Sequence, residues 1–267
     1  MHRSELISQI KKTKSFLCIG LDPDLTKFPP HLLDCEDPIF EFNKAIIDDT
    51  KEHCVAYKPN TAFYEAYGVK GWISFEKTIK YIPSDKFIIA DAKRGDIGNT
   101  STQYAKAFFE SFPCDAVTIA PYMGEDSIKP FLQFKDKWAV VLGLTSNIGS
   151  ADFQILKNEL GECNYETILR KVASWGNSGN TMFVVGATNP THFASIRKII
   201  PDHFILVPGI GAQGGSLEEV CKNGLNSDIG LLVNSARDII YASSNTDFAQ
   251  KAAEKSYSIQ MEMSQWV

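Results

Sequence analysis

The stretch FIIADAKRGDIGNTS, residues 87–101, places charged side chains directly after an apolar run. Residues 87–90 have the composition of a buried strand. Four charges follow within six positions: Asp91, Lys93, Arg94 and Asp96. Charge at the end of a buried strand is costly unless the charges pair with one another or take part in chemistry. The stretch therefore predicts a buried strand that ends at a functional site.

Apolar runs of the same kind recur along the whole chain. Each is short, rich in Val, Ile and Leu, and continuous rather than alternating, which is typical of parallel strands buried on both faces. They cover residues 16–22, 54–60, 87–93, 116–122, 138–146, 182–188, 204–210 and 229–235, with helical patterns between them such as 37–50, 101–112 and 165–175. Eight strands alternating with helices predict an α/β fold, a single-domain (β/α)8 TIM barrel over residues 1–267. An open doubly wound sheet is the alternative.

Composition narrows the class of protein. The chain has 267 residues, 44% of them hydrophobic, and one barrel can reach this size. A net charge of -5 gives no reason to expect nucleic acid or an anionic membrane as partner. No apolar run approaches a membrane span, and the N-terminal residues lack the features of a signal peptide, so we expect a cytoplasmic protein. Six cysteines without a C-x-x-C pair are expected to be free thiols.

The connection after the fifth run is long. It covers residues 147–164 and leaves a strand at the face where barrels build their active sites. Loops of this length usually carry function or are disordered. We expect a lid over a ligand, and an ordinary surface excursion is the alternative.

Polar or special residues stand at the ends of most of the predicted strands: Asp22, Lys58, Asp91, Lys93, Ser146, Pro208 and Arg237. Any one of the acidic residues could be an ordinary helix cap or a solvated loop group. Charges at the ends of the first three strands together predict side chains that converge on one barrel mouth. Asp91 and Lys93 are two apart in a strand and so share a face, where Lys58 can join them. Such a row is a preorganised electrostatic site, or else a structural ion-pair network.

The last two strands carry a candidate phosphate site. VPGIGAQGGS (207–216) follows the seventh strand and VNSARDI (233–239) ends the eighth. Glycines let backbone N–H groups approach an anion, and barrels commonly hold phosphate in these two loops. Arg237 can supply a bidentate clamp and Gln213 a neutral donor.

The motif Asp91-x-Lys93-x-x-Asp96-Ile97 resembles the D-x-K-x-x-D-I signature of the orotidine 5'-phosphate decarboxylase family, most closely its bacterial branch with longer chains. The segments GLDPD (20–24), YKPN (57–60), LTSN (144–147), PGIGAQGG (208–215) and NSARDI (234–239) resemble further parts of that family in the right order. The resemblance implies decarboxylation of orotidine 5'-monophosphate to uridine 5'-monophosphate, the last step of de novo pyrimidine nucleotide synthesis, without cofactor or metal.

The resemblance also implies a role for each matching residue. Lys93 would deliver a proton to C6 of the pyrimidine, Asp91 would lie against the substrate carboxylate, and Lys58 would orient Asp91 and contact the ribose. In the remaining contacts, Asp22 would bind a ribose hydroxyl, Ser146 the pyrimidine, and Gln213 and Arg237 the phosphate, while Pro208 and Ile97 would surround the ring. Asp96, with Ile97 and Thr100, would act in the neighbouring subunit of a homodimer. Within one chain, the alternative role for Asp96 is a cap on the following helix.

Two other functions remain open at this point. Related barrels that decarboxylate or condense sugar phosphates share the D-x-K-x-x-D arrangement and use a divalent metal. Ile97 and LTSN favour the pyrimidine substrate instead, and the five histidines show no metal-ligand spacing. A non-catalytic barrel that binds a phosphorylated ligand is the second alternative. It would be expected to have lost part of the charge row, yet Lys58, Asp91, Lys93 and Asp96 are all present.

Overall fold

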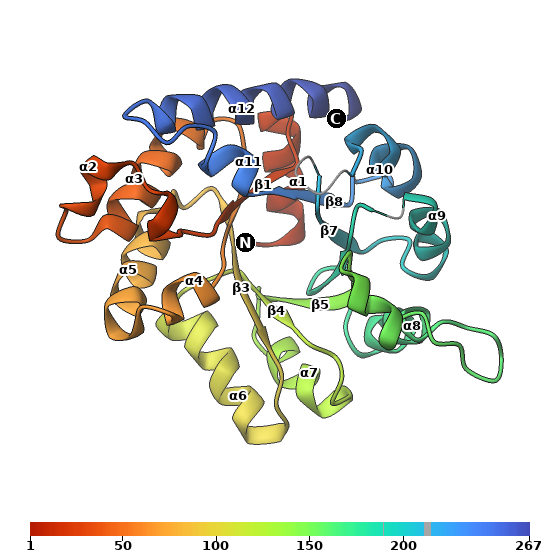
Figure 1. Ribbon diagram of the computed structural model, residues 1–267. Helices are drawn as coiled ribbons and strands as arrows, with labels where there is room; N and C mark the ends of the chain where they lie inside the picture. Colours follow the sequence, from red (N-terminus) through yellow and green to blue (C-terminus); the bar gives the residue numbers. More distant parts are fainter. Residues whose placement is uncertain (189, 211–214) are drawn as a thin grey trace.

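The computed structural model describes residues 1–188, 190–210 and 215–267. Its eight parallel strands close into one barrel in chain order, with β1 hydrogen-bonded to β8 (Figure 1). The strands are β1 Leu17–Leu21, β2 Ala56–Pro59, β3 Phe87–Arg94, β4 Ala116–Ile119, β5 Trp138–Leu144, β6 Thr181–Val185, β7 Phe204–Pro208 and β8 Leu231–Ser235. Each overlaps one of the eight apolar runs. The closed barrel confirms the predicted fold and excludes the open sheet.

The helices form a ring outside the barrel (Figure 1). They are α1 Arg3–Thr13, α2 Pro30–Leu33, α3 Pro38–Thr50, α4 Ala62–Glu65, α5 Gly68–Tyr81, α6 Gly98–Lys106, α7 Glu125–Leu132, α8 Asn164–Trp175, α9 Pro190–Ile199, α10 Leu217–Gly224, α11 Arg237–Ile240 and α12 Phe248–Met263. In the part of the chain that the structure describes, no helix is long and apolar enough to cross a membrane. All six cysteines are unbonded, as predicted.

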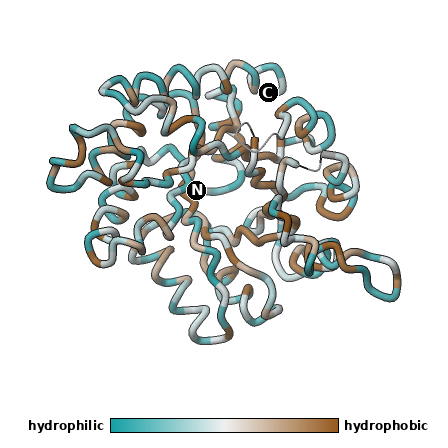
Figure 2. Tube along the Cα trace, viewed as in Figure 1, coloured by the Kyte–Doolittle hydropathy of each residue, from teal (hydrophilic) through white to brown (hydrophobic). Residues whose placement is uncertain are grey.

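The barrel interior is filled by large side chains from alternate strands. Trp138, the first residue of β5, packs edge-on against Phe87 and Phe204, the first residues of β3 and β7, with ring centroids 5.9 and 6.2 Å away. A layer contributed by alternate strands is how a barrel of this kind packs its core. The apolar residues accordingly gather toward the middle of the molecule in Figure 2. The core thus fills the end of the barrel at which the strands begin.

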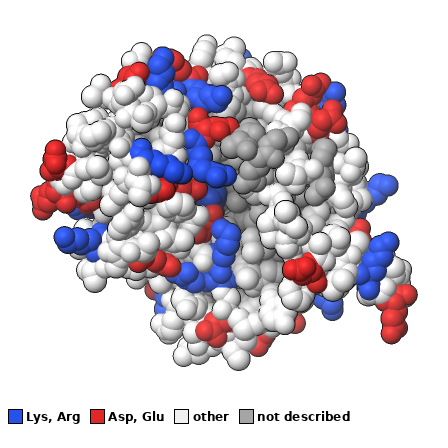
Figure 3. Space-filling model, in the orientation of Figure 1, with Lys and Arg blue, Asp and Glu red and all other residues white. Residues whose placement is uncertain are grey.

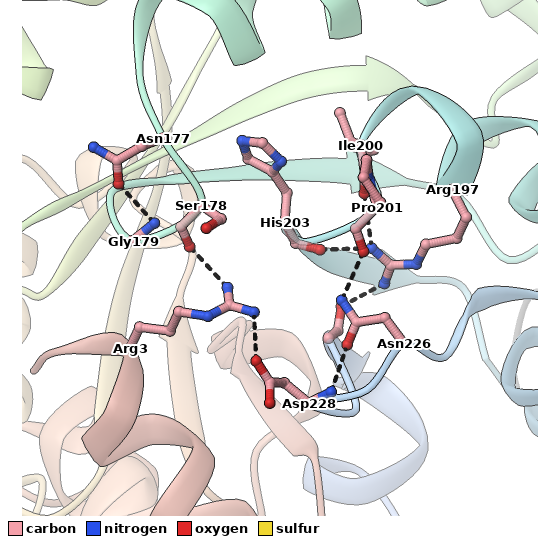
Figure 4. Close-up of polar contacts among 11 residues, drawn as sticks. Arg3, Asn177, Ser178, Gly179, Arg197, Ile200, Pro201, His203, Asn226 and Asp228 are labelled. Carbon is pink, nitrogen blue, oxygen red and sulfur yellow. Dashed lines mark hydrogen bonds and ion pairs between the residues drawn. The ribbon is translucent and has the colours of Figure 1, made fainter.

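Arginines fix the loops at this N-terminal end of the barrel (Figure 4). Arg3 donates to the carbonyl of Ser178 at 2.8 Å and to the carboxylate of Asp228 at 3.1 Å. Arg197 donates to the carbonyl of His203 at 2.6 Å and to that of Gly230 at 2.7 Å. Because these guanidinium groups hold backbone carbonyls, this end is structural, and the opposite end is where a ligand can enter.

The long connection after β5 is attached at its base. The side chain of Gln154 accepts from the N–H of Thr145 at 2.7 Å and donates to the hydroxyl of Thr145 at 2.8 Å. Farther along, the segment projects outward beside α8 and does not cover the barrel mouth (Figure 1). Ile148 and Leu160 are 97% and 90% exposed. This conformation does not test the predicted lid, which is taken up below as a proposal.

Candidate active site

The charges at the ends of β2 and β3 meet at one carboxylate. The Asp91 carboxylate accepts from the Lys58 ammonium at 2.5 Å through one oxygen and from the Lys93 ammonium at 2.7 Å through the other. Asp91 and Lys58 are buried, with 8% and 5% of their surface exposed, whereas about half of the Lys93 side chain is open to solvent. The predicted convergence on one mouth is therefore observed for these residues.

The two buried charges hold each other in the ionised state. Burial alone would raise the pKa of Asp91, but Lys58 and Lys93 outweigh it and hold that pKa well below its usual range. Burial would lower the pKa of Lys58, but Asp91 and Asp22 raise it above its ordinary value. The site therefore presents a fixed carboxylate between two ammonium groups at neutral pH.

Asp22 follows β1 and faces the same centre. Burial raises the pKa of its carboxyl group, although Lys58 opposes the shift. Its Oδ1 is buried and has no hydrogen-bond partner within the described part of the chain. Buried polar atoms are almost always paired in folded proteins. An oxygen of this kind is suited to receive the hydroxyl group of a ligand.

β3 is irregular where it carries Asp91 and Lys93. Its register against β4 shifts between Ala90 and Arg94, so residues 91–93 lie opposite Thr118 alone. Lys93 has a φ of 46°, in the left-handed region, which costs a residue with a side chain about 1–2 kcal/mol. Its N–H donates to the Thr118 hydroxyl at 2.8 Å. Asp91 and Lys93 meet as predicted, but a bulge brings them together and not simple alternation.

A pocket joins this centre to the ends of β7 and β8. It is lined by Asp22, Lys58, Asn60, Asp91, Pro208, Gly209, Ile210, Asn234, Ser235, Ala236, Arg237 and Asp238. Basic side chains line the hollow at the centre of the face shown in Figure 3. The sequence interpretation placed five of these twelve residues as site residues, whereas the predicted site residues Lys93 and Ser146 are not among them. The polar lining residues that it missed are Asn60, Asn234, Ser235 and Asp238. All four stand in the segments YKPN and VNSARDI, so their position beside predicted site residues was the available signal.

Comparisons with known proteins identify the family of this chain. The Orotidine 5'-phosphate decarboxylase / HUMPS family matches residues 15–252 of the chain. The chain belongs to this family. It is 62% identical to orotidine 5'-phosphate decarboxylase of Flavobacterium johnsoniae, over 99% of this chain and 98% of the relative.

Solved structures of the family share the fold. The chain is similar to a putative orotidine-monophosphate-decarboxylase from Toxoplasma gondii, with a TM-score of 0.87, 33% identity, and coverage of 97% of that chain and 98% of this one. It is also similar to UMP synthase of Leishmania donovani, with a TM-score of 0.84 and 38% identity. That alignment covers 97% of this chain and 57% of the Leishmania chain.

The remaining positions that resemble the orotidine 5'-phosphate decarboxylase family lie on both sides of the pocket. Arg237 begins α11 and is exposed at the pocket rim. Gly209 has a φ of 97°, a conformation that glycine adopts without strain. Ser146 follows β5 and packs on Gly186, where a Cβ would lie 2.7 Å from the Ser146 Cβ. Gln213 lies outside the described residues.

Asp96 is not among the residues that line the pocket of its own chain. Its carboxylate accepts from the N–H of Ile97 at 2.8 Å. Helix α6 begins at Gly98 with Ile97 as its N-cap and no side-chain cap, so the helix-cap role for Asp96 is wrong. Ile97 is 53% exposed, and Thr100 is also exposed. In this structure, Asp96, Ile97 and Thr100 do not line the pocket described above.

Proposed function

We propose that this protein decarboxylates orotidine 5'-monophosphate to uridine 5'-monophosphate. The observation that carries the proposal is the row of Lys58, Asp91 and Lys93. Its first two members line one end of a pocket whose other end is Arg237, and Lys93 is paired with Asp91. The fixed charges of the row can stabilise the charge that develops on a substrate during a reaction, and the guanidinium of Arg237 can bind a phosphate. Orotidine 5'-monophosphate carries the carboxylate that leaves on its pyrimidine ring and a phosphate at its opposite end, which matches this arrangement.

The substrate spans the pocket from β8 to β3. Arg237 and the glycine-rich segment after β7 bind the phosphate, because a guanidinium and backbone N–H groups both suit an anion. Asp22 receives a ribose hydroxyl through its unpaired buried oxygen. Ser146 hydrogen-bonds the pyrimidine, and Pro208 contacts its face. Phosphate contacts far from the reacting carbon supply binding energy that can be used in the transition state.

Lys93 carries the chemical step. The bond between C6 and the carboxylate breaks, carbon dioxide leaves, and the electron pair stays on C6. The Lys93 ammonium stabilises this developing charge and then transfers its proton to C6. Exposure of about half of its side chain lets the resulting amine regain a proton from solvent. Asp91, 2.7 Å away, holds the ammonium in position before the substrate carboxylate departs.

Asp96 acts in the neighbouring subunit of a homodimer. It does not line the pocket of its own chain, and exposed apolar side chains occur in the same loops: Ile97 after β3, and Tyr122 and Met123 after β4, the last two 89% and 43% exposed. Apolar surface of this kind is typical of an interface between subunits. Burial of this surface against a second copy would carry Asp96 to the partner's charge row.

Subunit mixing tests this arrangement. Lys93→Ala and Asp96→Ala homodimers are each expected to be nearly inactive. A heterodimer of the two has one site with both lesions and one intact site, so activity should return toward half of the wild-type value. Mixing Lys93→Ala with Lys58→Ala is the matched control, because every site then keeps a lesion. Proven exchange without recovery in the first mixture would refute the action in trans.

The connection 147–164 closes over the bound nucleotide. It begins beside Ser146, and apolar side chains along it, Ile148 and Leu160 among them, are exposed in the open conformation. Closure would expel water and strengthen the electrostatic contacts at the reacting carbon.

A spectroscopic assay tests the proposed function. The ultraviolet spectrum of orotidine 5'-monophosphate mixed with the protein should change to that of uridine 5'-monophosphate, at the same rate with and without EDTA. Loss of activity in EDTA, with turnover of a sugar phosphate, would favour the metal-dependent barrels. Tight binding without turnover would favour a non-catalytic barrel.

A further inference from the structure

The further inference concerns Thr118, which stands within β4 and is 1% exposed. Its side chain lies opposite the bulge in β3 that carries Asp91 and Lys93. Thr118 is not among the residues that line the pocket. It contacts the charge row through hydrogen bonds to Asp91 and Lys93, so a role in the reaction would run through these two residues.

The hydrogen bonds of this hydroxyl have only one possible direction. The Lys93 N–H, 2.8 Å away, can only donate, so the Thr118 oxygen accepts there. The ionised Asp91 carboxylate, 3.0 Å away, can only accept, so the Thr118 proton points to it. One hydroxyl group therefore accepts a hydrogen bond from the backbone of Lys93 and donates one to the side chain of Asp91.

Both contacts hold groups that would otherwise have freedom to move. Lys93 has its backbone in the left-handed region at a break in the β3–β4 ladder, where its N–H is paired with a side chain. Such conformations persist only where surrounding contacts fix them. The Asp91 oxygen that receives Thr118 is the one that receives the Lys93 ammonium, at 2.7 Å. A shift of either group would change the position of the ammonium relative to the substrate.

We propose that Thr118 is a positioning residue for catalysis, which locks the left-handed backbone of Lys93 and orients Asp91 through its single hydroxyl. The inference rests on the proposed function, because it names what aims the proton donor of that reaction. Misplacement of a reacting group by about 1 Å can cost a factor of about 100 in rate. Phosphate binding at the far end of the pocket has no contact with Thr118 and should not change.

The test compares Thr118→Val with Thr118→Ser. Valine keeps the shape and the preference for a strand but lacks the hydroxyl, whereas serine keeps the hydroxyl. We expect Thr118→Val to lower kcat at least tenfold while the Kd for uridine 5'-monophosphate changes less than threefold. Thr118→Ser should retain kcat within about threefold of wild type. Thr181→Val is the matched control, because Thr181 is a fully buried threonine that begins β6 at the other end of the barrel.

A structural role alone would give a different pattern. Thr118→Val and Thr181→Val would then both lower the melting temperature and leave kcat near the wild-type value, which would overturn the proposal. Thr118→Ala removes the same hydroxyl without branching at Cβ and serves if the valine variant does not fold.

Crystal structures of wild type and Thr118→Val test the placement without any activity. The proposal predicts that Lys93 leaves its positive φ or that Asp91 rotates away from it, and an unchanged pair would refute it. An inactive wild type would refute the proposed function, but this structural comparison would still decide the role of Thr118.

Discussion

Removal of the Asp91 charge should destabilise the fold through the lysine it leaves behind. Asp91→Asn keeps the shape of the side chain but removes the counter-charge of Lys58, which is 5% exposed and 2.5 Å away. Breaking a buried ion pair typically costs about 3–5 kcal/mol, because the remaining charge is stranded away from water. Asp22 still offsets part of the Lys58 charge, so we expect the lower end, a loss of about 3 kcal/mol at pH 7.

The same reasoning fixes how this loss depends on pH. In wild type, Asp91 and Asp22 raise the pKa of Lys58 in spite of its burial. In Asp91→Asn, burial should instead pull the pKa of Lys58 below its unfolded value. The folded variant then releases a proton that the unfolded chain keeps, so its stability rises with pH relative to wild type. The difference between the two proteins should therefore shrink as the pH rises from 7 to 9.5.

Urea unfolding followed by tryptophan fluorescence measures both effects. Asp48→Asn is the matched control, because Asp48 has an ion pair with Lys51 in which both side chains are about 40% exposed. Exposed pairs of this kind contribute about 0–1 kcal/mol. A loss below 1 kcal/mol for Asp91→Asn, or a loss that does not change with pH, would refute the claim that Asp91 neutralises a buried charge.

Two further predictions concern phosphate binding and acid stability. Arg237→Ala should weaken binding of uridine 5'-monophosphate by about 1.5–3 kcal/mol, measured by calorimetry, with an unchanged melting temperature; equal binding would remove Arg237 from the phosphate site. Burial, aided by Arg3, lowers the pKa of His203 from the ordinary 6.5 to about 4. The unfolded chain therefore takes up a proton first, and wild type should lose up to about 3 kcal/mol of stability between pH 6.5 and 4. His203→Phe should lose correspondingly less in urea titrations over this range, and identical profiles would contradict the assignment.

The fold could be predicted from the sequence because its strands are buried on both faces. Each such strand is a continuous apolar run, and eight runs alternating with helices leave few architectures. The same logic placed Asp22, Lys58 and Asp91, since the carboxyl end of every barrel strand faces the same mouth.

The remaining features depend on contacts that local sequence does not encode. Thr118 stands within an apolar run, and nothing in AVTIAPY shows that its hydroxyl faces the end of the neighbouring strand. No turn residue marks the positive φ of Lys93, because the bulge follows from pairing between β3 and β4. Asn60 lines the pocket just after β2, but asparagine after a strand is also an ordinary turn residue. Asn234 lines the pocket from within β8, where nothing in the run itself shows which way its side chain faces.

The most direct test of the central claim is the Lys93→Ala variant under single-turnover conditions. The account predicts that wild type converts orotidine 5'-monophosphate to uridine 5'-monophosphate and carbon dioxide in EDTA. Lys93→Ala should lose essentially all decarboxylation while still binding uridine 5'-monophosphate through the phosphate contacts. Retention of a tenth or more of the wild-type rate by Lys93→Ala would contradict the assignment of Lys93 as the proton donor to C6.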